Sequence, residues 1–242
     1  MGKAWKNAGK AVKAEKKGRI FTKLAREILV AAKLGGVDPE GNARLKAAIS
    51  EAKSLSCPND TIERALKRAS GDTGDATIEE KIYEAFGPHQ VGIIIECQTD
   101  NKNRTVSDLK TLLRKNSGAW AENGSVSWNF NKVGMVEAST KKTVNDMEEE
   151  AIEVDASDVE TGEFSEQDLN VVTSYLFYTD LKNLETMQKA LVQREWEILK
   201  AEPAYRPKQA PDLTEEQQKE VYLLLEQLDD FEDSRRVYSS ID

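Results

Sequence analysis

The order of apolar patterns between residues 133 and 202 is the feature that most constrains the fold of this chain. A strand-like run, a helical run, two further strand-like runs, a second helical run and a last strand follow one another there. The second helical run places Leu181, Leu184, Met187 and Leu191 three or four residues apart, as a helix with one buried face requires. The order β-α-β-β-α-β predicts a ferredoxin-like unit, the split βαβ arrangement.

Strand and helix signals also lie on both sides of this unit. The run VGIIIECQT predicts a buried strand, RTVSDLKTLLRKNSG predicts a helix after it, and GSVSWNFNKVGMVEAS predicts strand, turn and strand. Near the C-terminus, LTEEQQKEVYLLLEQL predicts a helix and RRVYSS a strand. The patterns before the ferredoxin-like unit and those after it complete one α/β domain only when the ferredoxin-like unit is inserted in that domain. We therefore expect a discontinuous α/β domain of residues 77–132 and 204–242, interrupted by an inserted domain of residues 133–203.

The N-terminal part of the chain is expected to be helical. Residues 20–76 show three short helical patterns with apolar faces, the first of which ends at Gly35-Gly36, and GDTGDAT reads as a linker after them. Residues 1–19 have no apolar stripe, so they are predicted to form a flexible basic arm. The expected fold class is α+β, with an N-terminal three-helix bundle followed by two α/β domains, one ferredoxin-like and inserted in the other.

Charge is distributed unevenly along the chain. The 242 residues have a formal net charge of −9, but residues 1–70 contain 16 Lys and Arg against 7 Asp and Glu, and the remainder contains 18 against 36. A basic segment on an acidic chain indicates contact with a nucleic acid or a membrane surface. The alternative is that small helical domains carry Lys and Arg on their solvated faces.

Catalytic patterns are missing from the sequence. His89 is the single histidine, Cys57 and Cys97 lie far apart, and neither a P-loop nor a GxGxxG motif is present. An acidic run near the C-terminus could hold a cation through oxygen ligands, but a solvated acidic loop explains it as well; its carboxylates are Asp229, Asp230, Glu232 and Asp233. We therefore expect no enzyme activity, no metal, no cofactor and no small-molecule substrate.

The apolar residues of the sequence are dispersed. No run of about 18 apolar residues is present, and the basic N-terminal segment lacks the apolar core of a secretory signal. We expect a cytoplasmic protein that does not enter a membrane and is a monomer.

Several stretches resemble the YebC family, whose mitochondrial branch is known as a translational activator of cytochrome c oxidase. They are GRIFTKLAREILVAAKLGGVDPEGNARLKAAISEAK, PNDTIERALKRASG, YEAFGPHQVGIIIECQTDNKNRT, GSVSWNFNKVGMV and LLEQLDDFEDSRRVYSS. The resemblance implies a helical N-terminal domain and two α/β domains, one inserted in the other. The N-terminus departs from the family's GHSKW opening, because it lacks both histidines of the family's arm and keeps only Trp5.

The resemblance implies a regulator of gene expression, and two targets stay open. The favoured one is the ribosome, with ribosomal RNA bound through the basic N-terminal domain. The alternative is DNA, with the protein acting as a transcriptional regulator. A scaffold that binds only protein fits the basic N-terminal segment least well.

The candidate residues for RNA lie in the basic arm, on one face of the first helix and in the NKNRT segment, whereas a DNA-binding helix would use Arg64, Lys67 and Arg68 of the third helical pattern. Trp5 is a candidate for stacking on a base, and the NKNRT segment could bind RNA or could simply cap a helix. The candidate nucleic-acid-binding residues are Lys10, Lys13, Lys16, Lys17, Arg19, Lys23, Arg26, Lys33, Lys102, Asn103 and Arg104.

Overall fold

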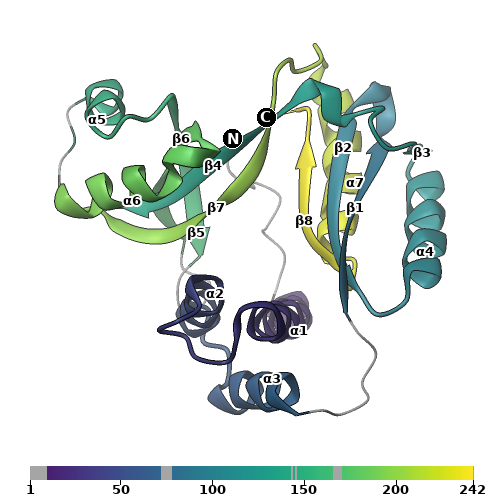
Figure 1. Ribbon diagram of the computed structural model, residues 1–242. Helices are drawn as coiled ribbons and strands as arrows, with labels where there is room; N and C mark the ends of the chain where they lie inside the picture. The colour runs from purple at the N-terminus through teal and green to yellow at the C-terminus, as the bar shows by residue number, and fades with distance from the viewer. Residues whose placement is uncertain (1–9, 72–77, 143, 145, 166–170, 242) are drawn as a thin grey trace. The chain divides into compact units, whose positions relative to one another are not determined.

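The computed structural model describes residues 10–71, 78–142, 144, 146–165 and 171–241. The chain divides into two compact units, and one division falls after Ala48, within helix α2 (Ala43–Ser54). The others fall after Pro58 and near residues 131–132 and 205–206. We call the unit with the first β-sheet the α1 unit and the unit with the second β-sheet the ferredoxin-like unit (Figure 1).

The first sheet has four antiparallel strands in the order β3-β1-β2-β8. Helices α4 and α7 pack their buried leucines against it, and α1 packs against α3 in the same unit. The bounds in this unit are α1 Lys10–Gly35, α3 Asn59–Ser70, β1 Glu79–Phe86, β2 Gly92–Thr99, α4 Lys102–Lys115, β3 Ala119–Ala121, α7 Glu215–Asp230 and β8 Ser234–Ser239. Because β8 comes from the end of the chain, the first sheet is discontinuous in sequence.

The second sheet has the order β5-β6-β4-β7, so its strands follow the order two-three-one-four along the chain. Helices α5 and α6 cover it, and their buried residues share one apolar core with Val136, Phe177 and Trp196. The bounds are β4 Phe130–Ser139, α5 Met147–Glu153, β5 Asp158–Ser165, β6 Val171–Asp180, α6 Leu184–Gln193 and β7 Glu197–Pro207. This is the split βαβ arrangement that the sequence predicts.

The expected fold class is confirmed, since N-terminal helices precede two four-stranded sheets and the strands of the second lie in sequence between those of the first. The predicted domain boundaries stay a prediction. The first helix ends where expected, because Gly36 takes the positive φ of +91° that glycine favours and its N–H donates to the carbonyl of Ala32.

Three local predictions are wrong. The first helix begins at Lys10 rather than at residue 20, so residues 10–19 are helical and not a flexible arm. Their Ala, Lys and Glu have high helix propensity, and a helix already nucleated by packing extends at little cost. The flexible state expected for residues 1–9, and the linker expected over residues 72–77, lie outside the described residues.

Strand β1 (EEKIYEAF) is absent from the prediction because Glu and Lys are rare in strands. It forms because it pairs with β2 on one side and with β3 on the other. The predicted strand in GSVSW is instead a turn followed by a 3-10 helix at Ser127–Asn129. The Glu84 carboxylate on β1 accepts the backbone N–H groups of Gly124, Val126 and Ser127, which closes this segment into a turn.

One buried carboxylate connects the elements of the α1 unit. Asp233, just before β8, is 3% exposed and accepts hydrogen bonds from Arg26 of α1 at 2.8 Å and from the hydroxyl of Thr105 of α4 at 2.6 Å. Arg104 of α4 approaches the carboxylate at 3.4 Å, and the backbone carbonyl of Asp233 accepts the N–H of Gln98 on β2. A buried charge that is paired in this way becomes costly when a partner is lost.

Asp233→Ala is expected to reduce the free energy of unfolding by about 3–5 kcal/mol, because Arg26 would keep its charge without its buried carboxylate partner. Glu232→Ala is the control: Glu232 also pairs with Arg26 but is 70% exposed, so its loss should cost less than about 1 kcal/mol. Urea unfolding measures both. Equal effects of the two substitutions would contradict this role for Asp233.

A second ion pair sets a pH dependence in the ferredoxin-like unit. Arg194 donates two hydrogen bonds to Glu150 of α5, at 2.7 and 2.8 Å, and the indole of Trp196 donates a third at 2.9 Å. The Arg194 hydrogen bond is the main cause that lowers the pKa of Glu150 from 4.5 to about 2. A carboxyl with a depressed pKa in the folded state stabilises above its unfolded pKa and loses that contribution as the pH falls toward the folded value.

Glu150→Gln should therefore be less stable than the parent chain at pH 7, and the difference should shrink at pH 3, between the two pKa values. Urea unfolding at both pH values measures the difference. Glu185→Gln is the matched control, since Glu185 pairs with Lys189 on an exposed helix face and should change stability little at either pH. A difference for Glu150→Gln that is the same at pH 7 and pH 3 would refute the assignment.

Candidate nucleic-acid interface

Helix α1 carries most of the predicted site. Its 26 residues include eight Lys and Arg against two Glu. Lys10, Lys13 and Lys17 are separated by three and four residues, the spacing at which helix positions neighbour one another. Lys10, Lys13 and Lys16 lie in the helix by their backbone, and their side chains are outside the described part of the structure, as is all of Trp5. Lys17 places its ammonium 5.7 Å from the ring centre of Phe21.

The next basic residues of α1 contact the chain's own acidic segment. Arg19, Lys23 and Arg26, four and three residues apart, meet the C-terminal end of α7 and the turn that follows it. Arg19 pairs with Asp230 at 3.3 Å, and the ammonium of Lys23 donates to the backbone carbonyl of Asp229. Cations are favoured at this end of a helix because its last carbonyls have no helical partner and carry the negative end of the dipole.

Arg26 is the most completely engaged of these three residues. Besides Asp233, it donates to the carboxylate of Glu232 at 3.1 Å and to the backbone carbonyls of Glu232 and Gln98, both at 3.0 Å. Its side chain is only 17% exposed. In this structure Arg26 therefore binds the protein itself, and a phosphate would have to displace several contacts to reach it.

A second ionic cluster lies beside the first. Glu27 of α1, which is buried, accepts hydrogen bonds from Arg44, Arg235 and the side-chain amide of Gln98, with Arg44 at 2.8 Å. Burial raises the pKa of Glu27, but the Arg44 hydrogen bond and the charges of Arg235 and Arg44 outweigh it and hold the pKa below its ordinary value. The face of α1 that bears Glu27 is thus held against β2 by a hydrogen bond from Gln98 and against β8 by the ion pair with Arg235.

The NKNRT segment forms a helix N-terminus. The side chain of Asn101 caps α4 by accepting the N–H of Arg104 at 3.2 Å, so the capping interpretation of this segment holds. Lys102 pairs with Glu79 at 2.7 Å and Arg104 pairs with Asp100 at 2.9 Å. Asn103 is exposed.

Exposed basic residues also lie at the C-terminal end of α1 and along α4. Lys33 is exposed in the last turn of α1. Lys110, Arg114 and Lys115 are exposed along α4. These residues are absent from the predicted site, which includes only the start of this helix, although residues 102–115 contain five basic residues against one acidic residue.

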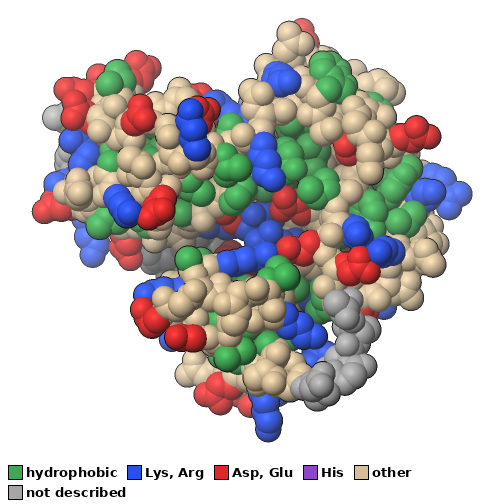
Figure 2. All heavy atoms as spheres, viewed as in Figure 1, with side chains coloured by type: hydrophobic (Ala, Val, Ile, Leu, Met, Phe, Trp, Pro, Cys, Tyr) green, Lys and Arg blue, Asp and Glu red, His purple; other side chains and the backbone are tan. Residues whose placement is uncertain are grey.

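Acidic side chains gather on the other unit. Figure 2 shows them over α5, whose first turn contains Glu148, Glu149 and Glu150. A polyanion is repelled by such a surface. The surface over α5 is therefore unsuited to a nucleic acid.

The single histidine, His89, is the first residue to consider for catalysis or metal binding. The imidazole Nε2 of His89 lies 2.8 Å from a carboxylate oxygen of Glu220, and His89 has a positive φ of +58° in the turn between β1 and β2. Among the described residues, no three His, Cys, Asp or Glu side chains are grouped so that they could hold a metal ion. None of the described helices is both long enough and apolar enough to cross a membrane.

Known proteins align with the chain along nearly its whole length. Two family descriptions match it, "TACO1/YebC protein N-terminal domain" over residues 2–72 and "TACO1/YebC second and third domain" over residues 78–241. A probable transcriptional regulatory protein of Bdellovibrio bacteriovorus is 48% identical over 242 residues, which is all of both chains. A protein of the same name from Pseudomonas fluorescens is 41% identical over 240 residues and 98% of each chain.

A solved structure shares the fold. The crystal structure of a conserved hypothetical protein from Aquifex aeolicus aligns with a TM-score of 0.81 and 33% identity, covering 94% of this chain and 90% of the other. With both family descriptions matched and full-length relatives at up to 48% identity, the chain belongs to the TACO1/YebC family.

Proposed function

We propose that this protein is a non-enzymatic, nucleic-acid-binding regulator of gene expression that acts on the ribosome and contacts ribosomal RNA through α1. The observation that carries the proposal is the continuity of α1. The basic residues from Lys10 to Arg19 extend a helix that the rest of the α1 unit holds in place. A basic segment whose backbone is already helical meets a phosphate backbone at a lower entropic cost than a loose segment does.

The favoured contact surface is the N-terminal half of α1. Arg19, Lys23 and Arg26 already contact the acidic end of α7, so they contribute less than their charge suggests. Lys10, Lys13, Lys16 and Lys17 precede that contact in the chain. Binding of such residues to phosphates gains free energy by releasing the counterions condensed on the nucleic acid.

Three further candidates have weaker support. Lys33 is exposed at the other end of α1, and Lys102 and Arg104 would have to exchange carboxylates for phosphates. We retain them, with Asn103, as peripheral contacts. We propose that the protein binds nucleic acid without a metal, a cofactor or a membrane. We also propose that it acts as a monomer in the cytoplasm.

The second candidate function is DNA binding by a transcriptional regulator. It is supported by the relatives from Bdellovibrio bacteriovorus and Pseudomonas fluorescens, which are named probable transcriptional regulatory proteins. Helix α3 would supply exposed Arg64, Lys67 and Arg68, although Arg64 pairs with Asp60 at 2.9 Å. A sequence-specific regulator should discriminate its site from random DNA by about 10³-fold or more.

Sedimentation with ribosomes tests the favoured function. At moderate salt the protein should pellet with ribosomes, and it should discriminate less than about 10-fold between genomic and random DNA fragments. The double substitution Lys13→Ala/Lys17→Ala should weaken binding to single-stranded ribosomal RNA segments. It should also flatten the dependence of log affinity on log salt by about 0.7 for each lost phosphate contact.

Lys182→Ala/Lys189→Ala is the matched control, because it removes two exposed lysines from the ferredoxin-like unit and should leave the salt dependence unchanged. An equal flattening in both double variants would show that the effect is one of net charge. Specific binding to duplex DNA without ribosome association would favour the second function instead.

A further inference from the structure

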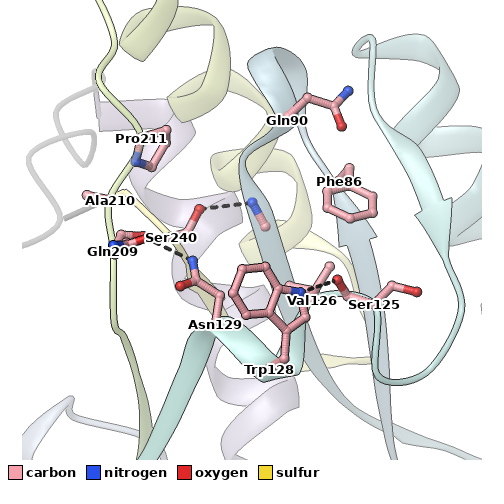
Figure 3. A pocket seen from close by; sticks show the side chains of 11 residues that line it. Phe86, Gln90, Ser125, Val126, Trp128, Asn129, Gln209, Ala210, Pro211 and Ser240 are labelled. Carbon is pink, nitrogen blue, oxygen red and sulfur yellow. Dashed lines mark hydrogen bonds between the residues drawn. The ribbon is translucent and has the colours of Figure 1, made fainter.

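A hollow of about 280 Å³ opens on the surface of the α1 unit (Figure 3). Phe86 at the end of β1, Gln90 in the following turn, Trp128, and Gln209 and Pro211 in the segment before α7 are among its lining residues. Small-molecule sites commonly measure about 300–1,000 Å³. At about 280 Å³ this hollow lies at the lower end of that range, which suits an occupant no larger than one ring system.

Trp128 presents an aromatic face at this hollow. Its side chain is 66% exposed, which is unusual for so large an apolar group. Its indole N–H already donates to the backbone carbonyl of Ser125 at 2.9 Å. The polar atom of the ring is therefore satisfied, and what the ring offers to a partner is its π face.

Hydrogen bonds to a buried carboxylate hold the turn that carries Trp128. Glu84, buried on β1, accepts the N–H groups of Gly124 at 2.8 Å, Val126 at 2.6 Å and Ser127 at 3.0 Å. Burial raises the pKa of Glu84, but the hydrogen bonds from these backbone donors outweigh it and lower the pKa below its ordinary value. An exposed tryptophan on such a supported turn is a prearranged contact surface.

The neighbouring chain adds a cation and a second support. The exposed Lys208 donates from its ammonium to the carbonyl of Trp128 at 2.5 Å, and its backbone N–H donates to the carbonyl of Asn129 at 2.8 Å. The side-chain amide of Asn129 donates to the carbonyl of Gln209 at 3.0 Å. A positive charge thus lies beside the residue whose ring is exposed.

The wall of the hollow also contains a polar atom that the described structure leaves unsatisfied. The Oδ1 atom of Asn129 is buried and has no hydrogen-bond partner among the described residues. Such an acceptor is costly and is uncommon in folded proteins. A donor on a bound molecule that reached this atom would offset that cost.

We propose that this hollow binds one unpaired nucleobase of RNA, stacked on Trp128, with Lys208 near the adjoining phosphate. The inference rests on the proposed function and assigns it a second contact besides α1. Unpaired bases stack on exposed aromatic side chains wherever proteins bind single-stranded nucleic acid, and a nearby cation follows the backbone. A duplex keeps its bases stacked on one another and has none to offer to the ring.

The test measures binding of the full chain to a fluorescein-labelled single-stranded RNA of mixed sequence, by anisotropy. Trp128→Leu should weaken binding by about 10-fold, the loss expected for one base–aromatic stack. Trp128→Phe keeps a π face and should stay within about 3-fold of the parent chain. Because stacking releases no counterions, Trp128→Leu should leave the salt slope unchanged, whereas Lys208→Ala should reduce it by about 0.7.

A blunt-ended RNA duplex of the same sequence is the control ligand, and its affinity should be the same for the parent chain and Trp128→Leu. Equal affinities of Trp128→Leu and the parent chain for single-stranded RNA would overturn the inference. If Lys13→Ala/Lys17→Ala still weakened binding in that case, the proposed function would stand. Failure of the parent chain to bind RNA or ribosomes would reject both.

The Trp128 and Lys208 variants are compared only after their urea unfolding midpoints are shown to match the parent chain. Glu84→Gln supplies an independent test, because it loosens the turn without touching the ring. It should weaken single-stranded RNA binding and leave duplex binding unchanged. Weakening of both would assign its effect to loss of folding and would contradict a positioning role for Glu84.

Discussion

The α1 unit depends on the buried carboxylate of Asp233. The carboxylate accepts hydrogen bonds from Arg26 of α1 and Thr105 of α4. The backbone carbonyl of the same residue accepts the N–H of Gln98 on β2. An N-terminal helix, a helix that covers the sheet and a C-terminal strand are thereby connected at one point. Because a buried charge is stable only with its partners, the position of α1 on the sheet is coupled to the integrity of the acidic turn.

The same contact changes how the basic residues of α1 are interpreted. From the sequence, Arg19, Lys23 and Arg26 form a cationic helix face suited to a phosphate backbone. In the structure these residues meet Asp230, the carbonyl of Asp229, and Asp233. The positive charge proposed for RNA therefore shifts toward Lys10–Lys17, and the stacking role expected of Trp5, which lies outside the described residues, gains a counterpart in Trp128.

Apolar periodicity was sufficient to predict the ferredoxin-like order and helix α7, because both bury regular rows of side chains. It could not reveal β1, whose charged sequence becomes a strand only through its two neighbours in the sheet. Nor could it show that Glu84 closes residues 124–127 into a turn, since that contact joins positions about 40 residues apart. Residue types identified the candidate cations, whereas their partners depend on contacts between distant parts of the chain, such as Arg26 with Asp233.

The central claim is that α1 is divided in function along its length, with its first half for nucleic acid and its second half for the protein. Amide hydrogen exchange of the full chain, with and without ribosomes, tests this most directly. We expect slower exchange over residues 10–19 when ribosomes are bound and no change over residues 20–35, whose side chains include Arg26 and Glu27 in paired contacts. Slower exchange confined to residues 20–35, or none in α1 despite ribosome binding, would contradict the account.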